Sequence, residues 1–138
     1  MKYSRIVLFS VGLFLLSVVL SATATLIVGF DEAVQSVYFD VSLHAISFAI
    51  FLFAYFYLGY KETTSPYKQA FLVAAGYWFI ELGVGVLLYI LLEVPIEPLI
   101  YLITALPHVI ATLLGTLLGI QLRLKKELSA NTYNKQLH

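Results

Sequence analysis

Long apolar runs alternate with short polar segments along the chain. The apolar runs cover residues 6–30, 41–60, 69–92 and 99–122. Each run is long enough for an α-helix to cross a bilayer, and its apolar residues are continuous, unlike the alternating pattern of strands in a membrane barrel. Pro95 and Pro98 separate the last two runs, because proline cannot continue a helix. The pattern predicts an all-α integral membrane protein in which residues 1–138 form a single four-helix bundle.

Charged residues divide between the two sides of this four-span arrangement. All lysines and arginines fall on one side: Lys2, Arg5, Lys61, Lys68, Arg123, Lys125, Lys126 and Lys135. The opposite side carries acidic residues: Asp31, Glu32, Asp40, Glu93 and Glu97. Because lysine and arginine accumulate on the cytoplasmic side of membrane proteins, we expect both termini and the polar tail 123–138 to be cytoplasmic.

The composition excludes several other kinds of protein. Of the 138 residues, 61% are hydrophobic and 12% are charged, which is too little charge for a soluble domain of this size. The sequence contains no cysteine, which excludes disulfides, thiolate metal sites and cysteine nucleophiles. The basic residues flank the spans instead of alternating with aromatic residues, so we expect no nucleic-acid binding.

The two ends of the chain carry weaker patterns. Lys2 and Arg5, the apolar stretch after them and Ala22-Thr23-Ala24 are similar to a cleavable signal peptide. Apolar residues continue to Phe30, which favours an uncleaved first span. From residue 125 the tail is polar and without periodicity, so we expect a frayed helix end followed by disorder.

Glu81 is the main indication of function. At a rise of about 1.5 Å per residue it lies about 17 Å below the outer end of the third span, where a carboxylate costs about 2.5–3.5 kcal/mol. His108 lies about 14 Å below the outer end of the fourth span, so the two side chains have similar depths. A carboxylate and an imidazole there would relay a proton, hold a ligand group or form a structural hydrogen bond.

Small and polar residues share one face of the fourth span: Thr104, His108, Thr112, Gly115 and Gly119. Thr112 belongs with His108 in the expected polar site, and Pro107 predicts a kink beside it. Gly115 and Gly119 have the four-residue spacing that lets two helices approach closely, so we expect them to serve helix packing.

Spans one and three add hydroxyl groups near Glu81. Tyr77 lies one turn before Glu81 and is a hydroxyl donor for the polar site. Ser17 and Ser21 are four residues apart in span one, and we expect them to pack against a neighbouring helix. Aromatic residues cluster towards the ends of spans two and three, where most of them are typical of anchors at the membrane interface. They are Tyr55, Phe56, Tyr57, Tyr60, Tyr67, Tyr77 and Trp78.

Asp40 and His44 lie four residues apart at the outer end of span two, on a helical face that Ser47 and Phe51 continue inwards. Two interpretations remain open. In the first, Asp40 starts the helix and pairs with His44, an interaction that contributes about 0.2–0.5 kcal/mol. In the second, both residues join Glu81 in one polar site.

The order of these features resembles the VanZ-like family of small polytopic membrane proteins. The segment Asp40-Val41-Ser42-Leu43-His44-Ala45-Ile46-Ser47-Phe48 and the close Leu58-Gly59-Tyr60 are similar to the family pattern D-K-x-x-H-F-x-x-Y with its leucine-glycine end. Ile80-Glu81-Leu82 resembles the family glutamate of the third span. The terminal N-x-x-G-x-x-x-G helix resembles Ile110-Ala111-Thr112-Leu113-Leu114-Gly115-Thr116-Leu117-Leu118-Gly119.

The resemblance covers about residues 10–122 and implies a multi-pass protein of the plasma membrane in a bacterial or archaeal cell envelope. It implies that Asp40, His44 and Glu81 share a polar site, and it supplies no reaction. The sequence departs from the family at four places. Val41 replaces a lysine, and Val84 replaces a glutamine. Thr112 replaces an asparagine, and Pro107-His108 stands where the family has an acidic residue.

Three functions follow as alternatives. The first is the binding of a lipid-linked or amphiphilic molecule in an outward-opening pocket between the helices. The second is a proton-coupled transporter or channel protomer, a homo-oligomer in which Glu81 exchanges a proton that His108 relays. The third is a non-catalytic subunit that assembles with a partner membrane protein.

We do not expect an enzyme. The sequence holds no serine-histidine-acid set, no HExxH helix, no glycine-rich phosphate loop and no paired carboxylates at the spacing of a known enzyme family. We also expect no cofactor and no metal, because His44, His108 and Glu81 have no ligand spacing that supports a metal site.

Overall fold

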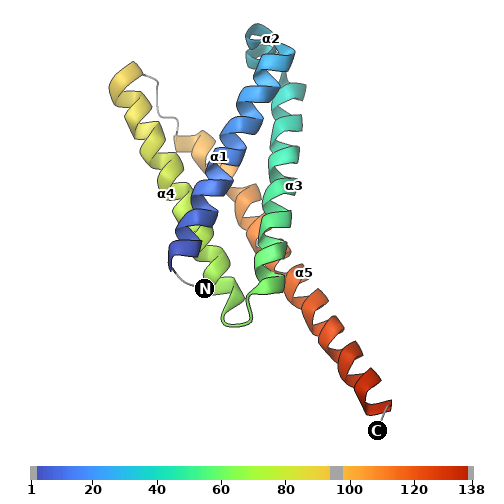
Figure 1. Ribbon diagram of the computed structural model, residues 1–138. Helices are drawn as coiled ribbons and strands as arrows, with labels where there is room; N and C mark the ends of the chain where they lie inside the picture. The colour runs from blue at the N-terminus through green and yellow to red at the C-terminus, as the bar shows by residue number, and fades with distance from the viewer. Residues whose placement is uncertain (1–2, 94–97, 137–138) are drawn as a thin grey trace.

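The computed structural model describes residues 3–93 and 98–136, apart from the side chains of residues 32–34, 98–103 and 131–136. The described residues form five helices, α1 (Tyr3–Val28), α2 (Phe30–Gln35), α3 (Val37–Lys61), α4 (Pro66–Leu92) and α5 (Pro98–Gln136), shown in Figure 1. Four of them, all except α2, contain a stretch long and apolar enough to cross a membrane. The prediction of an all-helical chain with four membrane-length helices is confirmed.

The connection between α1 and α3 differs from the sequence prediction. α1 ends at Val28, and Gly29 follows with φ of +95°, a backbone conformation that glycine adopts without steric cost. The chain then forms the short helix α2, where the sequence predicted only a polar connection. Ser36 caps α3 by accepting a hydrogen bond from the Phe39 N–H at 3.3 Å, so α3 begins at Val37 rather than at residue 41.

The limits of α4 and α5 also follow local signals. α4 begins with Pro66 in its first turn, where the missing N–H of proline costs nothing. It ends at Leu92, and the N–H of Glu93 donates to the Tyr89 carbonyl at 3.0 Å. α5 remains helical through Pro107.

The expectation of a frayed and disordered tail from residue 125 is wrong, because α5 remains helical through Gln136. Leucine, lysine and glutamate in this segment are good helix formers. Local bonds also support the helix, since the Ser129 hydroxyl donates to the Lys125 carbonyl at 3.0 Å and Arg123 lies 3.9 Å from Glu127.

α3 and α5 pack closely because glycine removes the side chain at their contacts. A Cβ atom built on Gly115 would overlap the Leu52 carbonyl oxygen, and one on Gly119 would overlap the Phe56 carbonyl oxygen. A Cβ on Gly59 of α3 would in turn overlap the backbone of Thr116. The two helices therefore meet backbone to backbone at these three positions.

α1 packs against α4 through a buried serine. The Ser10 hydroxyl lies 3.0 Å from the Ile6 carbonyl of its own helix and 3.0 Å from the Val73 carbonyl of α4. Gly76 of α4 faces this serine, because a Cβ there would overlap the Ser10 hydroxyl. Buried apolar residues surround these contacts and form the core: Ile6, Leu13, Phe51, Tyr55, Leu58, Ala70, Val73, Ala74, Tyr77 and Ala111.

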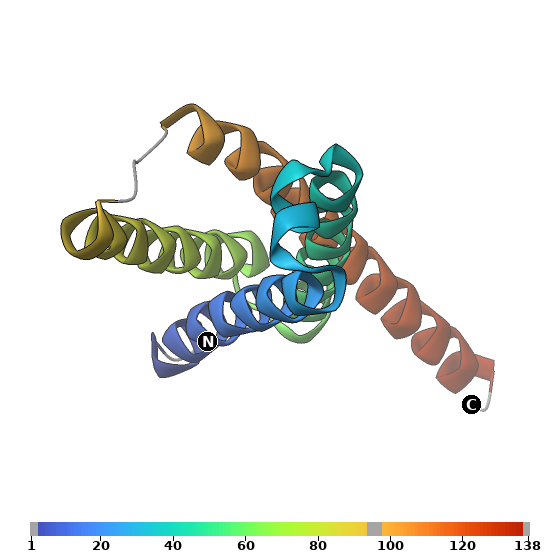
Figure 2. The ribbon, with the colours of Figure 1, turned by 90° about the horizontal axis from the view of Figure 1, so that it is seen from above.

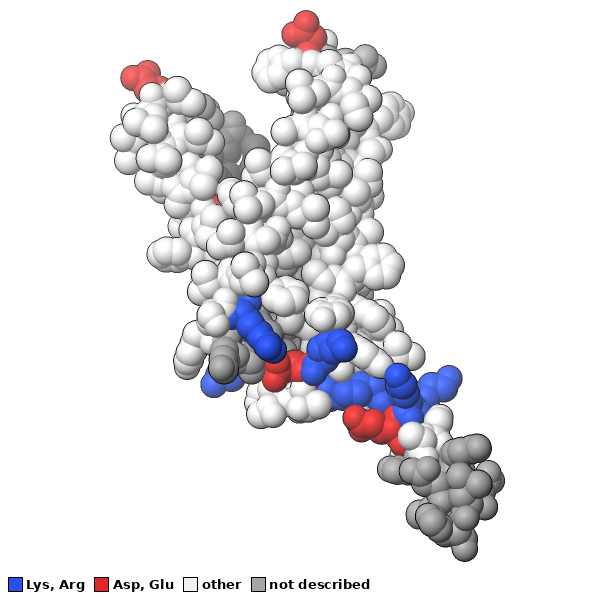
Figure 3. Space-filling model, in the orientation of Figure 1, with Lys and Arg blue, Asp and Glu red and all other residues white. Residues whose placement is uncertain are grey.

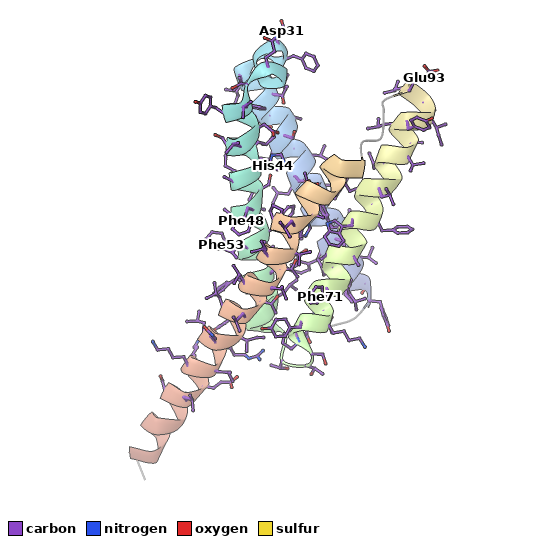
Figure 4. All side chains as sticks on the ribbon, turned by 180° about the vertical axis from the view of Figure 1, so that it is seen from behind. Asp31, His44, Phe48, Phe53, Phe71 and Glu93 are labelled. Carbon is purple, nitrogen blue, oxygen red and sulfur yellow. The ribbon has the colours of Figure 1, made fainter. Side chains whose placement is uncertain are left out.

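Charge separates along the long axis of the bundle. Lysine and arginine gather at one end, where α1 begins, α3 ends and α4 begins (Figure 3). Asp31 and Glu93 lie at the opposite end, which Figure 4 labels. Lys2 and Glu97 lie outside the described residues, as do the side chains of Glu32 and Lys135. The described charges thus have the separation that the sequence predicted for the two ends of a four-span bundle.

The bundle is packed at its basic end and open at its acidic end. Figures 1 and 2 show α4 diverging from α1 and α3 towards Leu92, and Figure 3 shows two separate projections at this end. The last residues of α4 are exposed apolar side chains: Leu87, Leu88, Tyr89, Ile90, Leu91 and Leu92. The free end of α4 is therefore apolar.

Candidate intramembrane polar site

Two neighbouring cavities lie between the helices. The first has a volume of about 120 Å³ and is lined by residues of α1, α3, α4 and α5. The second, of about 270 Å³, is lined by residues of α1, α3 and α4. The residues common to both are polar or amphipathic: Ser17, His44, Ser47, Tyr77 and Glu81. The shared wall makes them one site with two compartments.

Glu81 lies on the wall of both compartments and of a third cavity beside Trp78, Leu82 and Ala105. Its side chain is half-buried. Among the residues that the structure describes, no ion pair or hydrogen bond joins Glu81 to another group. A carboxylate has two oxygens that accept hydrogen bonds, and neither is bonded to a described residue.

His108 is buried at the inner wall of the first cavity, held from several sides. Its Nε2 lies 2.7 Å from the Tyr55 hydroxyl oxygen, and its ring is stacked on that of Phe51 at a centroid distance of 4.2 Å. The rings of Tyr77 and Trp78 meet it edge to face at 4.7 and 5.6 Å. These contacts fix the imidazole in one orientation.

Glu81 and His108 line the same cavity, as their similar depths suggested, but no hydrogen bond joins them. The imidazole instead pairs with Tyr55. Thr112 lies one turn further along α5, fully buried, and its hydroxyl donates to the His108 carbonyl at 2.8 Å. Thr112 thus supports the His108 turn from below and is not part of either cavity wall.

His44 forms the outer edge of the site. Its Nδ1 lies 2.8 Å from the Asp40 backbone carbonyl and 3.4 Å from the Asp40 carboxylate. A carbonyl oxygen only accepts, so Nδ1 carries a proton in this contact. Asp40 itself lines neither cavity, because its exposed carboxylate stays at the rim beside His44. Figure 4 labels His44 and Phe48, a neighbouring wall residue on α3.

Ser17 and Tyr77 connect α1 to α4 at the base of the second cavity. The Ser17 hydroxyl donates to the Phe14 carbonyl at 2.8 Å and lies 3.4 Å from the Tyr77 hydroxyl, from which it accepts. Ser21, which we expected at a helix contact, is exposed and lines the second cavity. Gly115 and Gly119 lie against α3, away from both cavities.

Two of the aromatic residues predicted as interface anchors are buried inside the bundle instead. Tyr55 and Tyr77 have exposed fractions of 0% and 7%, because their hydroxyls bond to His108 and Ser17 inside the bundle. Trp78 lines the first cavity. The missed signal was helical spacing: the face that passes through His44, Ser47 and Phe51 reaches Tyr55 one turn later.

The site offers hydrogen-bond acceptors and aromatic surfaces rather than metal ligands. Within residues 3–93 and 98–136 no group of three histidine, aspartate or glutamate side chains is arranged to hold a metal ion. No family model, no curated protein and no solved structure matches this sequence. The geometry of the cavities therefore carries the functional argument.

Proposed function

We propose that this chain is a VanZ-like, multi-pass protein of the plasma membrane that binds the polar end of a lipid-linked or amphiphilic molecule between its helices. The observation that carries the proposal is the position of Glu81. It lies half-buried on the shared wall of two cavities, with no partner among the described residues. A carboxylate is costly inside a bilayer, so an unpaired one in a cavity favours a binding role.

The walls around Glu81 suit an amphiphile because polar and apolar surfaces adjoin. Ser17, His44 and Ser47 supply hydrogen-bonding groups at the floor. Phe14, Val18 and Leu43 line the second cavity beside them. Above this level the exposed apolar residues of α4 continue towards Leu92, where an acyl or prenyl chain would lie against them.

The opening would face the extracytoplasmic side. Its rim carries Asp31 and Glu93, whereas lysine and arginine lie at the other end of the bundle. Since basic residues accumulate on the cytoplasmic side, both termini would be cytoplasmic and the polar site would open outwards. A ligand would then enter from the outer leaflet.

Filling the cavity tests this proposal. Ser47 lines both compartments, and Ser47→Phe would place a ring in the space between them. Ser42→Phe is the matched control, because Ser42 is exposed on the same helix and lines neither compartment. Each protein is extracted with its native lipids, and the co-purifying molecules are quantified by mass spectrometry.

We expect wild type and Ser42→Phe to retain an amphiphile that Ser47→Phe loses, while all three proteins unfold at similar temperatures. Loss of a co-purifying protein from Ser47→Phe, with lipids unchanged, would replace the proposal with an assembly role. Identical lipid profiles in the three proteins, with no thermal shift on adding phosphatidylglycerol, phosphatidylethanolamine or a polyprenyl phosphate, would overturn it.

A further inference from the structure

We infer that the group bound in the first cavity is a small organic cation, an alkylammonium carried by the amphiphile. The inference rests on the proposed function and adds the chemical class of the bound end. With histidine counted as neutral, Glu81 is the one formal charge among the described residues that line the two compartments. A cation beside it would gain the ion pair that the carboxylate lacks.

Aromatic rings form much of the remaining wall. Phe48, Phe51, Tyr77 and Trp78 all line the first cavity, the compartment that also contains Glu81. An ammonium within about 6 Å of an aromatic face is attracted by the ring quadrupole, most strongly by tryptophan, and more so where water is excluded. Glutamate combined with several rings is the composition of a quaternary-ammonium site.

The volume of the first cavity agrees with this ligand. About 120 Å³ corresponds to roughly four water molecules at about 30 Å³ each, which is room for an ammonium with a few methyl groups. The second cavity continues from it with Phe14, Val18 and Leu43, where the first methylenes of an attached chain would lie.

Anionic ligands do not fit the same walls. Neither compartment is lined by lysine or arginine, and no lining residue therefore supplies a permanent positive charge. Glu81 would repel a phosphate or carboxylate. The Tyr55 hydroxyl, a polar group close to His108, is already bonded to the imidazole.

The test compares three probes of equal chain length: dodecyltrimethylammonium, dodecyldimethylamine oxide and dodecyl maltoside. The first is a cation, whereas the other two carry no net charge at pH 7.5. Binding to the full chain in lipid nanodiscs is measured by competition with a fluorescent alkylammonium and by thermal shift. Glu81→Gln removes the charge with little change in shape, and Glu93→Gln is the matched control, since Glu93 is exposed at the end of the same helix.

We expect wild type and Glu93→Gln to prefer dodecyltrimethylammonium over the amine oxide by at least about tenfold, and Glu81→Gln to lose that preference. Equal binding of all three probes, unaffected by Glu81→Gln, would overturn the cation inference and leave the amphiphile site standing. Binding of none would overturn both proposals.

Two further experiments test the contribution of the aromatic rings and identify the source of the cation. Trp78→Leu should weaken dodecyltrimethylammonium about three- to tenfold, and Trp78→Phe, which keeps an aromatic face, should weaken it less; equal losses would overturn the aromatic contribution. Diheptanoyl phosphatidylcholine that competes with dodecyltrimethylammonium would identify a lipid headgroup as the cation. Its failure to compete would identify a singly charged amphiphile, and either result supports a cation site.

Discussion

The hydroxyl oxygen of Tyr55 lies 2.7 Å from Nε2 of His108, where both side chains are buried. The bond links α3 to α5 and is covered by Phe51, whose ring is within 9° of parallel to the imidazole. Because His108 is also part of the first cavity wall, this bond attaches the polar site to the closely packed pair of helices. The cavity can therefore be altered through Tyr55, which does not line it.

Tyr55→Phe should destabilise the bundle by about 1–2 kcal/mol. The substitution keeps the ring and removes the hydroxyl, which leaves the buried Nε2 of His108 without that partner. Unfolding in mixed micelles of mild and denaturing detergent measures the change. Tyr57→Phe is the control, because Tyr57 is 50% exposed on the same helix and should change stability by less than about 0.5 kcal/mol. Equal effects of the two substitutions would show that the bond contributes nothing.

Gly119→Ala should also destabilise the protein, by about 1–3 kcal/mol, because the new Cβ would overlap the backbone of α3 at Phe56 and Tyr60 and force α3 and α5 apart. Gly83→Ala is the opposite case, since a Cβ at Gly83 meets nothing within 4 Å. It should be neutral or stabilising by up to about 1 kcal/mol, because alanine favours a helix over glycine. Thermal unfolding of both variants checks the contrast, and a stable Gly119→Ala would contradict the close packing.

The number of membrane-length helices could be predicted because it depends on local composition alone. The observed helix ends differ from the predicted ones where a single residue sets the backbone conformation. Gly29 ends α1 in this way, and Ser36 starts α3. The absence of apolar periodicity predicted disorder in the tail of α5, but periodicity does not report helix propensity, and the segment begins with the good helix formers Lys125 to Leu128.

The sequence identifies those site residues whose burial in a membrane is costly. Glu81 and His108 stood out because ionisable groups are rare in apolar spans, and in the structure both line the first cavity. Depth cannot identify the partner of each group, which depends on the rotation of each helix about its axis. Tyr55 was therefore taken for an interface anchor, since a tyrosine hydroxyl bonded to a headgroup and one bonded to an imidazole look alike in a sequence.

Arg123→Gln should destabilise the basic end of the bundle by about 1–2 kcal/mol. The Arg123 guanidinium donates to the backbone carbonyls of Glu62 and Gly59, where α3 ends and its last carbonyls lack helical partners. Lys125→Gln removes a charge from an exposed neighbouring residue and should have a smaller effect. Hydrogen exchange at residues 58–62, compared between the two variants, would show whether the loss is local to the end of α3. Equal exchange would contradict the capping role.

Glu81→Gln should leave the free protein as stable as wild type or more stable. The carboxylate is half-buried with no ion pair among the described residues, and an amide of nearly the same shape avoids its cost in an apolar surrounding. Thermal unfolding without added ligand measures this, with Glu93→Gln as the exposed control. A variant that loses stability by more than about 1 kcal/mol would show that the carboxylate has a structural role instead.

Cysteine labelling should confirm the direction of insertion, and the sequence makes the experiment clean because it contains no cysteine. Asp31→Cys and Glu93→Cys lie at the acidic end. Lys61→Cys lies at the last residue of α3, and Lys125→Cys follows the apolar run 99–122 of α5. A membrane-impermeant maleimide added to intact cells should label the first pair, and the second pair should react only after the membrane is opened. These residues are exposed, so the substitutions should not disturb packing. The reverse labelling pattern would place the polar site towards the cytoplasm and would require its ligand to come from the inner leaflet.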